Sequence, residues 1–120
     1  MARRSRLENR GRFHQAMGTE AKRGFSELIN GDKPVVVDFT ATWCGPCKAM
    51  APIMEQFKQQ IGDRAVVLKV DIDRNPAAAR HYQIQGVPTL AIFKRGGIVW
   101  RRSGVMSAAE LKAAIEPHLE

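Results

Sequence analysis

The chain contains two cysteines, Cys44 and Cys47, and these residues are the best suited to covalent chemistry. They follow an apolar, β-branched stretch at 35–40 and stand where a helical pattern begins. A thiol at the N-terminus of a helix faces free backbone N–H groups and the positive end of the helix dipole. Both favour the thiolate and lower the thiol pKa from its usual value of about 8.5. The spacing therefore predicts a dithiol in which Cys44 attacks and Cys47 resolves.

The position of each cysteine suggests a different environment. Cys44 stands at the edge of the helix, so we expect it to be the exposed, low-pKa thiol, whereas Cys47 lies one turn further on and should be shielded. Gly45 and Pro46 suit a tight helix entry, because proline fixes φ and lacks an N–H that the first turn would leave unpaired.

Two other uses of the cysteine pair fit less well. A structural zinc site needs four ligands, and the histidines that could complete one, His14, His81 and His118, lack the required spacing. A purely structural disulfide across so short a loop would stabilise the fold little. Moreover, no apolar segment follows Arg3 and Arg4 as in a secretory signal, which predicts a cytoplasmic protein with reduced thiols.

Apolar periodicity divides the chain into alternating strands and helices. The pattern predicts a helix at 20–30, a strand at 35–40 buried on both faces, a helix at 45–61 kinked by Pro52, and a buried strand at 65–70. A short helix capped by Asn75 should follow and extend to about Tyr82.

The C-terminal part predicts a hairpin and a last helix. Strands at 89–93 and 98–102 are joined by a link at 94–97 that is too short for a parallel crossover. A capping box of Ser107 and Glu110 then opens a helix whose apolar face comprises Leu111, Ala114, Ile115 and Leu119. The predicted fold class is α/β, a layered sandwich with a mixed central sheet.

Length and charge restrict the kind of protein further. The 120 residues fit one domain, and no apolar run exceeds four residues, whereas a membrane-spanning helix needs about 20. The net charge of +7 is concentrated in an N-terminal arm at 1–18, which lacks apolar periodicity, so the domain should occupy 19–120. Basic residues elsewhere are scattered without interleaved aromatic residues, which disfavours nucleic-acid binding.

The run from Trp43 to Cys47, WCGPC, resembles the active site of the thioredoxin family. The resemblance covers about four-fifths of the chain, from Phe25 to Leu119. Its motifs occur in order: Val37-Asp38-Phe39, the WCGPC run, Lys48, Ala51-Pro52, Lys69-Val70-Asp71-Ile72-Asp73, Gly86-Val87-Pro88-Thr89 and Gly104. It implies a thioredoxin fold, a three-layer sandwich whose mixed sheet has four to five strands.

The resemblance implies that Asp38 is the buried proton acceptor for the Cys47 thiol. Independently, a carboxylate within an apolar strand should have a raised pKa, unless it turns to solvent. Lys69 would approach Asp38 from the neighbouring strand, or else extend from that strand into water.

The resemblance also implies a substrate-binding surface around the cysteines. Pro88 would follow a cis peptide bond and face them, and Val87 would offer backbone groups to an extended substrate. Trp43 would be an exposed aromatic residue beside the nucleophile, and Gly104 would adjoin it. The alternatives are an ordinary trans proline and a tryptophan packed in the core.

Two features depart from the family pattern. Thr40 stands where the family usually carries a second tryptophan, which affects packing under the active site. No edge strand can be identified in residues 1–18, although the family begins with one.

The function implied by the resemblance is general protein disulfide reduction. The partners would be disulfide-containing proteins and a reductase, typically an NADPH-dependent flavoenzyme, that regenerates the dithiol of a monomeric protein. No bound cofactor or metal would be needed. The alternatives are an oxidant or isomerase on the same fold, and a non-catalytic binding module using the surface around Trp43 and Pro88.

Met17 directly precedes the first helical pattern, so residues 1–16 could be an upstream extension. A solvated tail is the simplest interpretation of these residues, and a basic handle for an acidic partner or nucleic acid is the alternative.

Overall fold

A computed structural model describes residues 25–119. After helical residues 25–29, the chain forms these elements: β1 (Val35–Thr40), α2 (Gly45–Ile61), the 3₁₀ turn η1 (Gly62–Arg64), β2 (Val66–Asp71), α3 (Pro76–His81), β3 (Thr89–Lys94), β4 (Gly97–Ser103), α4 (Ala108–Ile115) and the 3₁₀ turn η2 (Glu116–His118). The predicted arm at 1–18 and the start of the predicted first helix lie outside the described residues.

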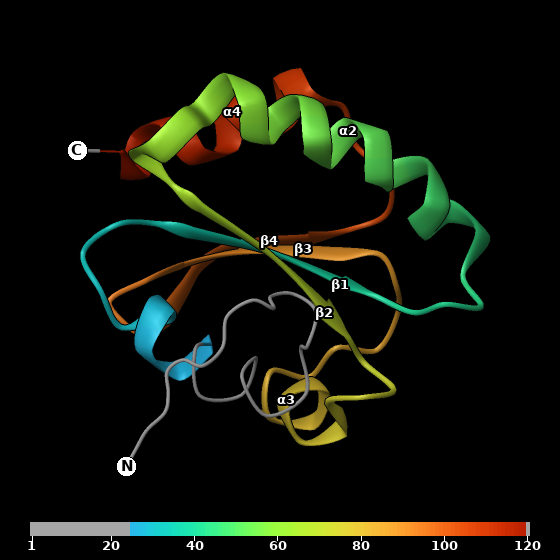
Figure 1. Ribbon diagram of the computed structural model, residues 1–120. Helices are drawn as coiled ribbons and strands as arrows, with labels where there is room; N and C mark the ends of the chain where they lie inside the picture. The colour runs from blue at the N-terminus through green and yellow to red at the C-terminus, as the bar shows by residue number, and fades with distance from the viewer. Residues whose placement is uncertain (1–24, 120) are drawn as a thin grey trace, which may run out of the picture.

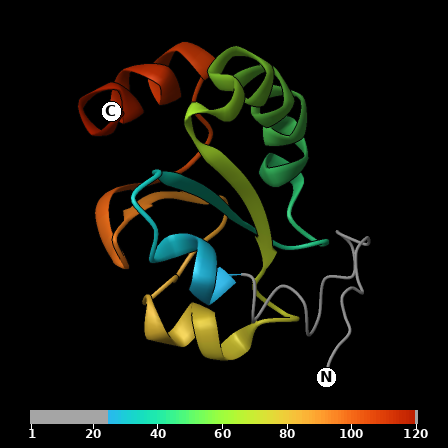
Figure 2. The ribbon, with the colours of Figure 1, turned by 60° about the vertical axis from the view of Figure 1, so that its left-hand side comes forward.

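The described strands form one mixed sheet in the order β2-β1-β3-β4. β1 pairs in parallel with β2 and antiparallel with β3, and β3 and β4 form the predicted hairpin. Figures 1 and 2 show α2 and α4 on one face of the sheet, and α3 with the helical residues 25–29 on the other. The predicted three-layer α/β sandwich is confirmed.

β1 is central because both of its faces are apolar. Successive side chains of a strand point to opposite faces, so Val36 packs with α2 and α4 while Val35 and Val37 pack on the other side.

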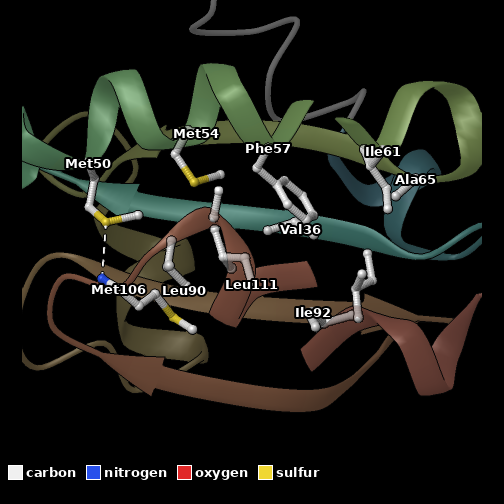
Figure 3. Close-up of a cluster of buried hydrophobic side chains, with 12 residues drawn as sticks. Val36, Met50, Met54, Phe57, Ile61, Ala65, Leu90, Ile92, Met106 and Leu111 are labelled. Atoms are coloured by element: carbon white, nitrogen blue, oxygen red, sulfur yellow. Dashed lines mark hydrogen bonds between the residues drawn. The ribbon is translucent and has the colours of Figure 1, made fainter. Parts of the chain in front are cut away.

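Figure 3 shows the first of these clusters, in which Met50, Met54, Phe57 and Ile61 of α2 point toward Val36, Leu90 and Ile92 of the sheet. Every residue of β1 is buried, including Asp38.

β2 differs from the prediction of a second buried strand. It occupies Val66–Asp71, and apart from Val70 its residues are half-buried or exposed. The reason is its place at an edge of the described sheet, where one side has no neighbouring strand.

Two local predictions also need correction. Asn75 occupies the predicted N-cap position of α3, but its side chain accepts no hydrogen bond from the helix, and its side-chain amide donates to the Asp71 carbonyl at 2.9 Å instead. The hairpin link is shorter than predicted, since Lys94 and Gly97 pair with each other and leave Arg95 and Gly96 as the turn. Both turn residues have positive φ, 53° and 88°, as a two-residue hairpin of the I′ class requires.

The two longer helices follow the sequence pattern. α2 begins at Gly45, continues through Pro52 and ends before Gly62. The capping box of α4 is formed, because Glu110 N–H donates to Ser107 Oγ at 3.1 Å and Ser107 N–H donates to Glu110 Oε1 at 2.9 Å. No helix among residues 25–119 has the length and apolar character needed to cross a membrane.

Candidate active site

Cys44 and Cys47 form a disulfide at the N-terminus of α2, with their Cα atoms 5.3 Å apart. The Cys44 amide donates to the Ala41 carbonyl at 3.2 Å, which folds the chain sharply between β1 and α2. The two cysteines pack with Ala41, and Ile72 and Val87 cover them from other parts of the chain. The β1–α2 junction thus holds a dithiol or disulfide pair in a small apolar setting.

Cys44 is the N-cap residue of α2. Its Sγ accepts a hydrogen bond from the Cys47 backbone N–H at 3.1 Å, in the place of the usual hydroxyl or carboxylate cap. When the disulfide is reduced, the same N–H and the helix dipole favour a negative charge on this sulfur. Pro46 lies within the first turn, where it has no N–H to leave unpaired.

The prediction that Cys44 is the exposed cysteine is wrong for this disulfide form. Cys44 is 4% exposed and Cys47 is 6% exposed, so exposure does not distinguish them. The reason is Val87, whose carbonyl oxygen lies 3.6 Å from Cys44 Sγ and whose side chain packs against the pair. The feature that distinguishes the two sulfurs is the N-cap hydrogen bond.

Asp38 is a buried carboxyl group that lies close to Cys44 and Cys47 in the sequence. It is 4% exposed, and its Oδ1 has no hydrogen-bond partner. It lies two residues after Val36 on β1, so its side chain points to the face that α2 covers. Burial raises the pKa of Asp38 from 3.8 to about 6, although the positive charge of Lys69 offsets part of that effect.

Lys69 is the β2 residue paired in register with Asp38. It is exposed, as expected for an edge strand, and acts on Asp38 through its charge while Asp38 Oδ1 remains without a hydrogen bond. Lys69 therefore combines the two expected arrangements, because it lies beside Asp38 on the neighbouring strand and its side chain also extends into water.

The segment before β3 lies against the disulfide. The Val87–Pro88 peptide bond is cis, and the Pro88 carbonyl accepts the Gly104 N–H at 2.8 Å. Gly104 has a φ of 100°, a conformation that favours glycine. The contacts place Val87, Pro88 and Gly104 around one end of the sheet, next to Cys44.

Trp43 is 67% exposed and adjoins Cys44 in the chain. Its indole Nε1–H donates to Asp73 Oδ2 at 2.8 Å. Sequence reasoning gave Asp73 no role, although it belongs to a motif that carried the family resemblance. The Asp73 backbone is fixed in turn by the Asp71 carboxylate, which accepts its N–H at 2.8 Å.

Comparison with known proteins identifies the family. The sequence matches the thioredoxin family over residues 16–117. A thioredoxin-like protein of Synechocystis is 52% identical over 88 residues, which cover 72% of this chain and 84% of the relative. A thioredoxin of Acidithiobacillus ferridurans is 43% identical over 94 residues, covering 78% and 87%. The structure of a mutant thioredoxin from Halobacterium salinarum superposes with a TM-score of 0.73 at 36% identity, covering 80% of this chain and 83% of that one.

The chain belongs to the thioredoxin family. With its CxxC pair at the N-terminus of α2, this thioredoxin is a thiol–disulfide oxidoreductase with protein disulfide reductase activity.

Two further relatives are longer proteins than this thioredoxin. A bifunctional thioredoxin reductase/thioredoxin of Mycobacterium leprae is 41% identical over 87 residues, which are 72% of this chain and 19% of that protein. A chloroplastic thioredoxin Y of rice is 43% identical over 97 residues, which are 80% of this chain and 58% of that protein.

Thr40 is where this thioredoxin departs from the pattern expected at its active site. The residue is buried at the end of β1, and its carbonyl accepts the Ile72 N–H at 2.9 Å. That bond ties β1 to the segment that carries Asp73 and Ile72. Residues 25–119 contain no group of three or more His, Cys, Asp and Glu side chains arranged to hold a metal ion.

Proposed function

We propose that Cys44 is the attacking thiol of this thioredoxin. The observation that carries the proposal is the N-cap hydrogen bond from Cys47 N–H to Cys44 Sγ, which favours the thiolate on Cys44. The Cys44 thiolate attacks one sulfur of a protein disulfide, and the other substrate sulfur leaves as a thiolate. The product is a mixed disulfide between Cys44 and the substrate.

Cys47 then resolves the mixed disulfide. Asp38 accepts the Cys47 proton, directly or through a bridging water molecule. The resulting Cys47 thiolate attacks Cys44 Sγ. The remaining substrate sulfur leaves, so the substrate gains two electrons and the protein retains the Cys44–Cys47 disulfide. The Asp38 pKa of about 6 suits this role, because the carboxylate is a stronger base than an ordinary aspartate and is still mostly ionised near neutral pH. Lys69 moderates that shift, while Gly45 and Pro46 shape the turn that holds both sulfurs.

The substrate-binding surface consists of Trp43, Val87, Pro88 and Gly104. Trp43 is a large exposed aromatic side chain beside Cys44, and Val87 lies over the Cys44 sulfur. An extended substrate segment that places its disulfide at Cys44 would lie along the backbone of Val87.

A separate reductase returns two electrons to the disulfide. We expect an NADPH-dependent thioredoxin reductase, and the name of the bifunctional Mycobacterium leprae relative supports such a partner. The thioredoxin domain would begin near residue 19 and act as a cytoplasmic monomer without a bound cofactor. Some relatives are named as chloroplastic, so fractionation of the source cells tests the proposed cytoplasmic location against a plastid one.

The test is reduction of insulin disulfides in the presence of dithiothreitol. The wild-type protein should accelerate insulin precipitation, and Cys44→Ser should reduce the rate to that of dithiothreitol alone. A wild-type protein without activity would overturn the proposal and favour a binding module. The equilibrium with glutathione separates a reductase from an oxidant or isomerase, because a reductase holds its disulfide strongly against reduction by glutathione.

A further inference from the structure

The residues between α3 and β3 form a loop, residues 82–88, that brings Val87 to the active-site sulfur. The Val87 carbonyl oxygen lies 3.6 Å from Cys44 Sγ, and the Val87 side chain packs against the two cysteines. The loop is not held by regular secondary structure, and Gln83 within it has a φ of 56°, which is uncommon for a residue other than glycine. Backbone N–H groups of Gln83 and Ile84 tie the start of the loop to α3, and its position against the sheet and the cysteines depends on contacts with the rest of the fold.

Arg101 of β4 makes the first such contact. Its Nη1 donates to the Tyr82 carbonyl at 2.6 Å and its Nη2 donates to the Gln83 carbonyl at 3.0 Å. One planar guanidinium thus fastens two successive carbonyls just after α3, at the negative end of that helix. The bonds hold the loop where Gln83 adopts its unfavourable conformation.

Ser103 makes the second contact through Thr89. Thr89 is buried, and its hydroxyl lies 2.6 Å from the Gly86 carbonyl and 2.9 Å from Ser103 Oγ. A carbonyl oxygen only accepts, so the single Thr89 proton goes to Gly86 and Ser103 must donate to Thr89. The chain of bonds from Ser103 through Thr89 to Gly86 fastens the loop next to Val87.

These contacts come from one strand and lie on both sides of Val87. Arg101 holds the start of the loop, and Ser103 holds its end, where Gly104 N–H also binds the Pro88 carbonyl at 2.8 Å. We propose that Arg101 and Ser103 are positioning residues that hold Val87 against the Cys44 sulfur and thereby set the reactivity of that sulfur. The inference rests on the proposed role of Cys44 as the attacking thiol.

Loosening the loop should lower the pKa of the Cys44 thiol. A carbonyl oxygen beside a sulfur carries partial negative charge and disfavours the thiolate, and the Val87 side chain keeps water away from it. Retreat of Val87 should therefore make the thiolate easier to form. Loss of the Arg101 charge alone would act in the opposite direction, so the two causes can be told apart.

The experiment measures alkylation of Cys44 by iodoacetamide as a function of pH in a Cys47→Ser background, where Cys44 is the one remaining thiol. Arg101→Met and Ser103→Ala should each lower the midpoint of the pH profile by about half a pH unit. In the protein with both cysteines, the same substitutions should lower kcat/KM for insulin reduction about threefold or more, because Val87 no longer guides the substrate.

Control variants isolate positioning from charge and from stability. Arg102→Met removes the same charge from the next residue of β4, whose side chain lies 3.7 Å from Glu110 Oε2, and it should leave the profile unchanged. Ser103→Thr retains the hydroxyl and should restore wild-type behaviour. Arg101→Lys keeps the charge but cannot span both carbonyls with a planar fork, so it should resemble Arg101→Met.

The inference is overturned if Arg101→Met and Ser103→Ala change the melting temperature but leave the alkylation profile like that of Arg102→Met. A midpoint that rises in Arg101→Met and returns to the wild-type value in Arg101→Lys would also overturn it, because charge would then be the cause. The alkylation profile does not depend on catalysis. Failure of wild-type insulin reduction would therefore refute the proposed function separately from the positioning role.

Discussion

The Trp43 indole is held by Asp73 through a 2.8 Å hydrogen bond, although 30 residues separate the two in the chain. Trp43 is 67% exposed, so little packing fixes this large side chain beside Cys44. The bond therefore orients an aromatic surface that would otherwise move freely in water, and it does so from the same segment that supplies Ile72 to the cover of the cysteines.

Replacement of Asp73 should weaken substrate binding more than catalysis. Asp73→Ala removes the acceptor and should raise KM for insulin about two- to fivefold with little change in kcat, as expected for an exposed bond worth about 0.5–1 kcal/mol. Fluorescence anisotropy in a Trp100→Phe background should fall as Trp43 gains mobility. Asp73→Asn retains an acceptor oxygen and serves as the control. A mobile Trp43 with an unchanged KM would show that this side chain does not contact substrate.

Asp38→Asn should stabilise the folded protein at neutral pH. The folded-state pKa of about 6 lies above the value of 3.8 for an ordinary aspartate, so the folded chain holds this proton more tightly than the unfolded chain does. The stability from this group is full below about pH 4 and is lost as the pH rises through 6, a change of roughly 3 kcal/mol. The Asn variant should lack this decline. Urea unfolding between pH 4 and 8 measures it, and Asp63→Asn, at an exposed position, is the control.

Asp38→Asn should also slow the resolving step. Without a nearby proton acceptor, release of substrate from the mixed disulfide should slow about tenfold at neutral pH. In the wild-type protein the same step should slow below pH 6, where Asp38 becomes protonated. Stopped-flow decay of a preformed mixed disulfide measures both effects. An unchanged rate would assign the proton to another acceptor.

Elements specified by local patterns could be predicted from the sequence. The bounds of α2, the capping box at Ser107 and the antiparallel hairpin each depend on residues close together in the chain, and each was confirmed. The site motif was equally local, because the CxxC pair and its helix are contiguous.

Features that depend on distant residues could not be predicted in the same way. The cover of Cys44 comes from Val87, 43 residues away, so the sequence could not show that this sulfur is buried in the disulfide form. The Arg95–Gly96 turn requires positive φ at an arginine, which the residue type disfavours, and it docks on the Ile29 carbonyl through Gly96 N–H at 2.6 Å. Tertiary contact therefore decided both outcomes.

A chain that starts at Met17 should keep its stability and activity. Residues 1–16 carry several arginines but no apolar periodicity, and the match to the thioredoxin family begins at residue 16. Thermal unfolding should change by no more than about 2 °C, and insulin reduction should change by less than about twofold. A clear loss of stability would mean that these residues pack on the domain. Loss of activity alone, strongest at low salt, would mean that they recruit substrate by charge.

The most direct test of the account is to trap the mixed disulfide with single-cysteine variants. Cys47→Ser keeps the attacking thiol, and Cys44→Ser keeps the proposed resolving thiol. Each variant is mixed with a disulfide-bonded peptide, and the rate of adduct formation is followed by mass spectrometry. The account predicts rapid, stable adducts on Cys44 in the Cys47→Ser protein and far slower ones on Cys47 in the other variant. Faster reaction at Cys47 would contradict the assignment of Cys44 as the attacking thiol.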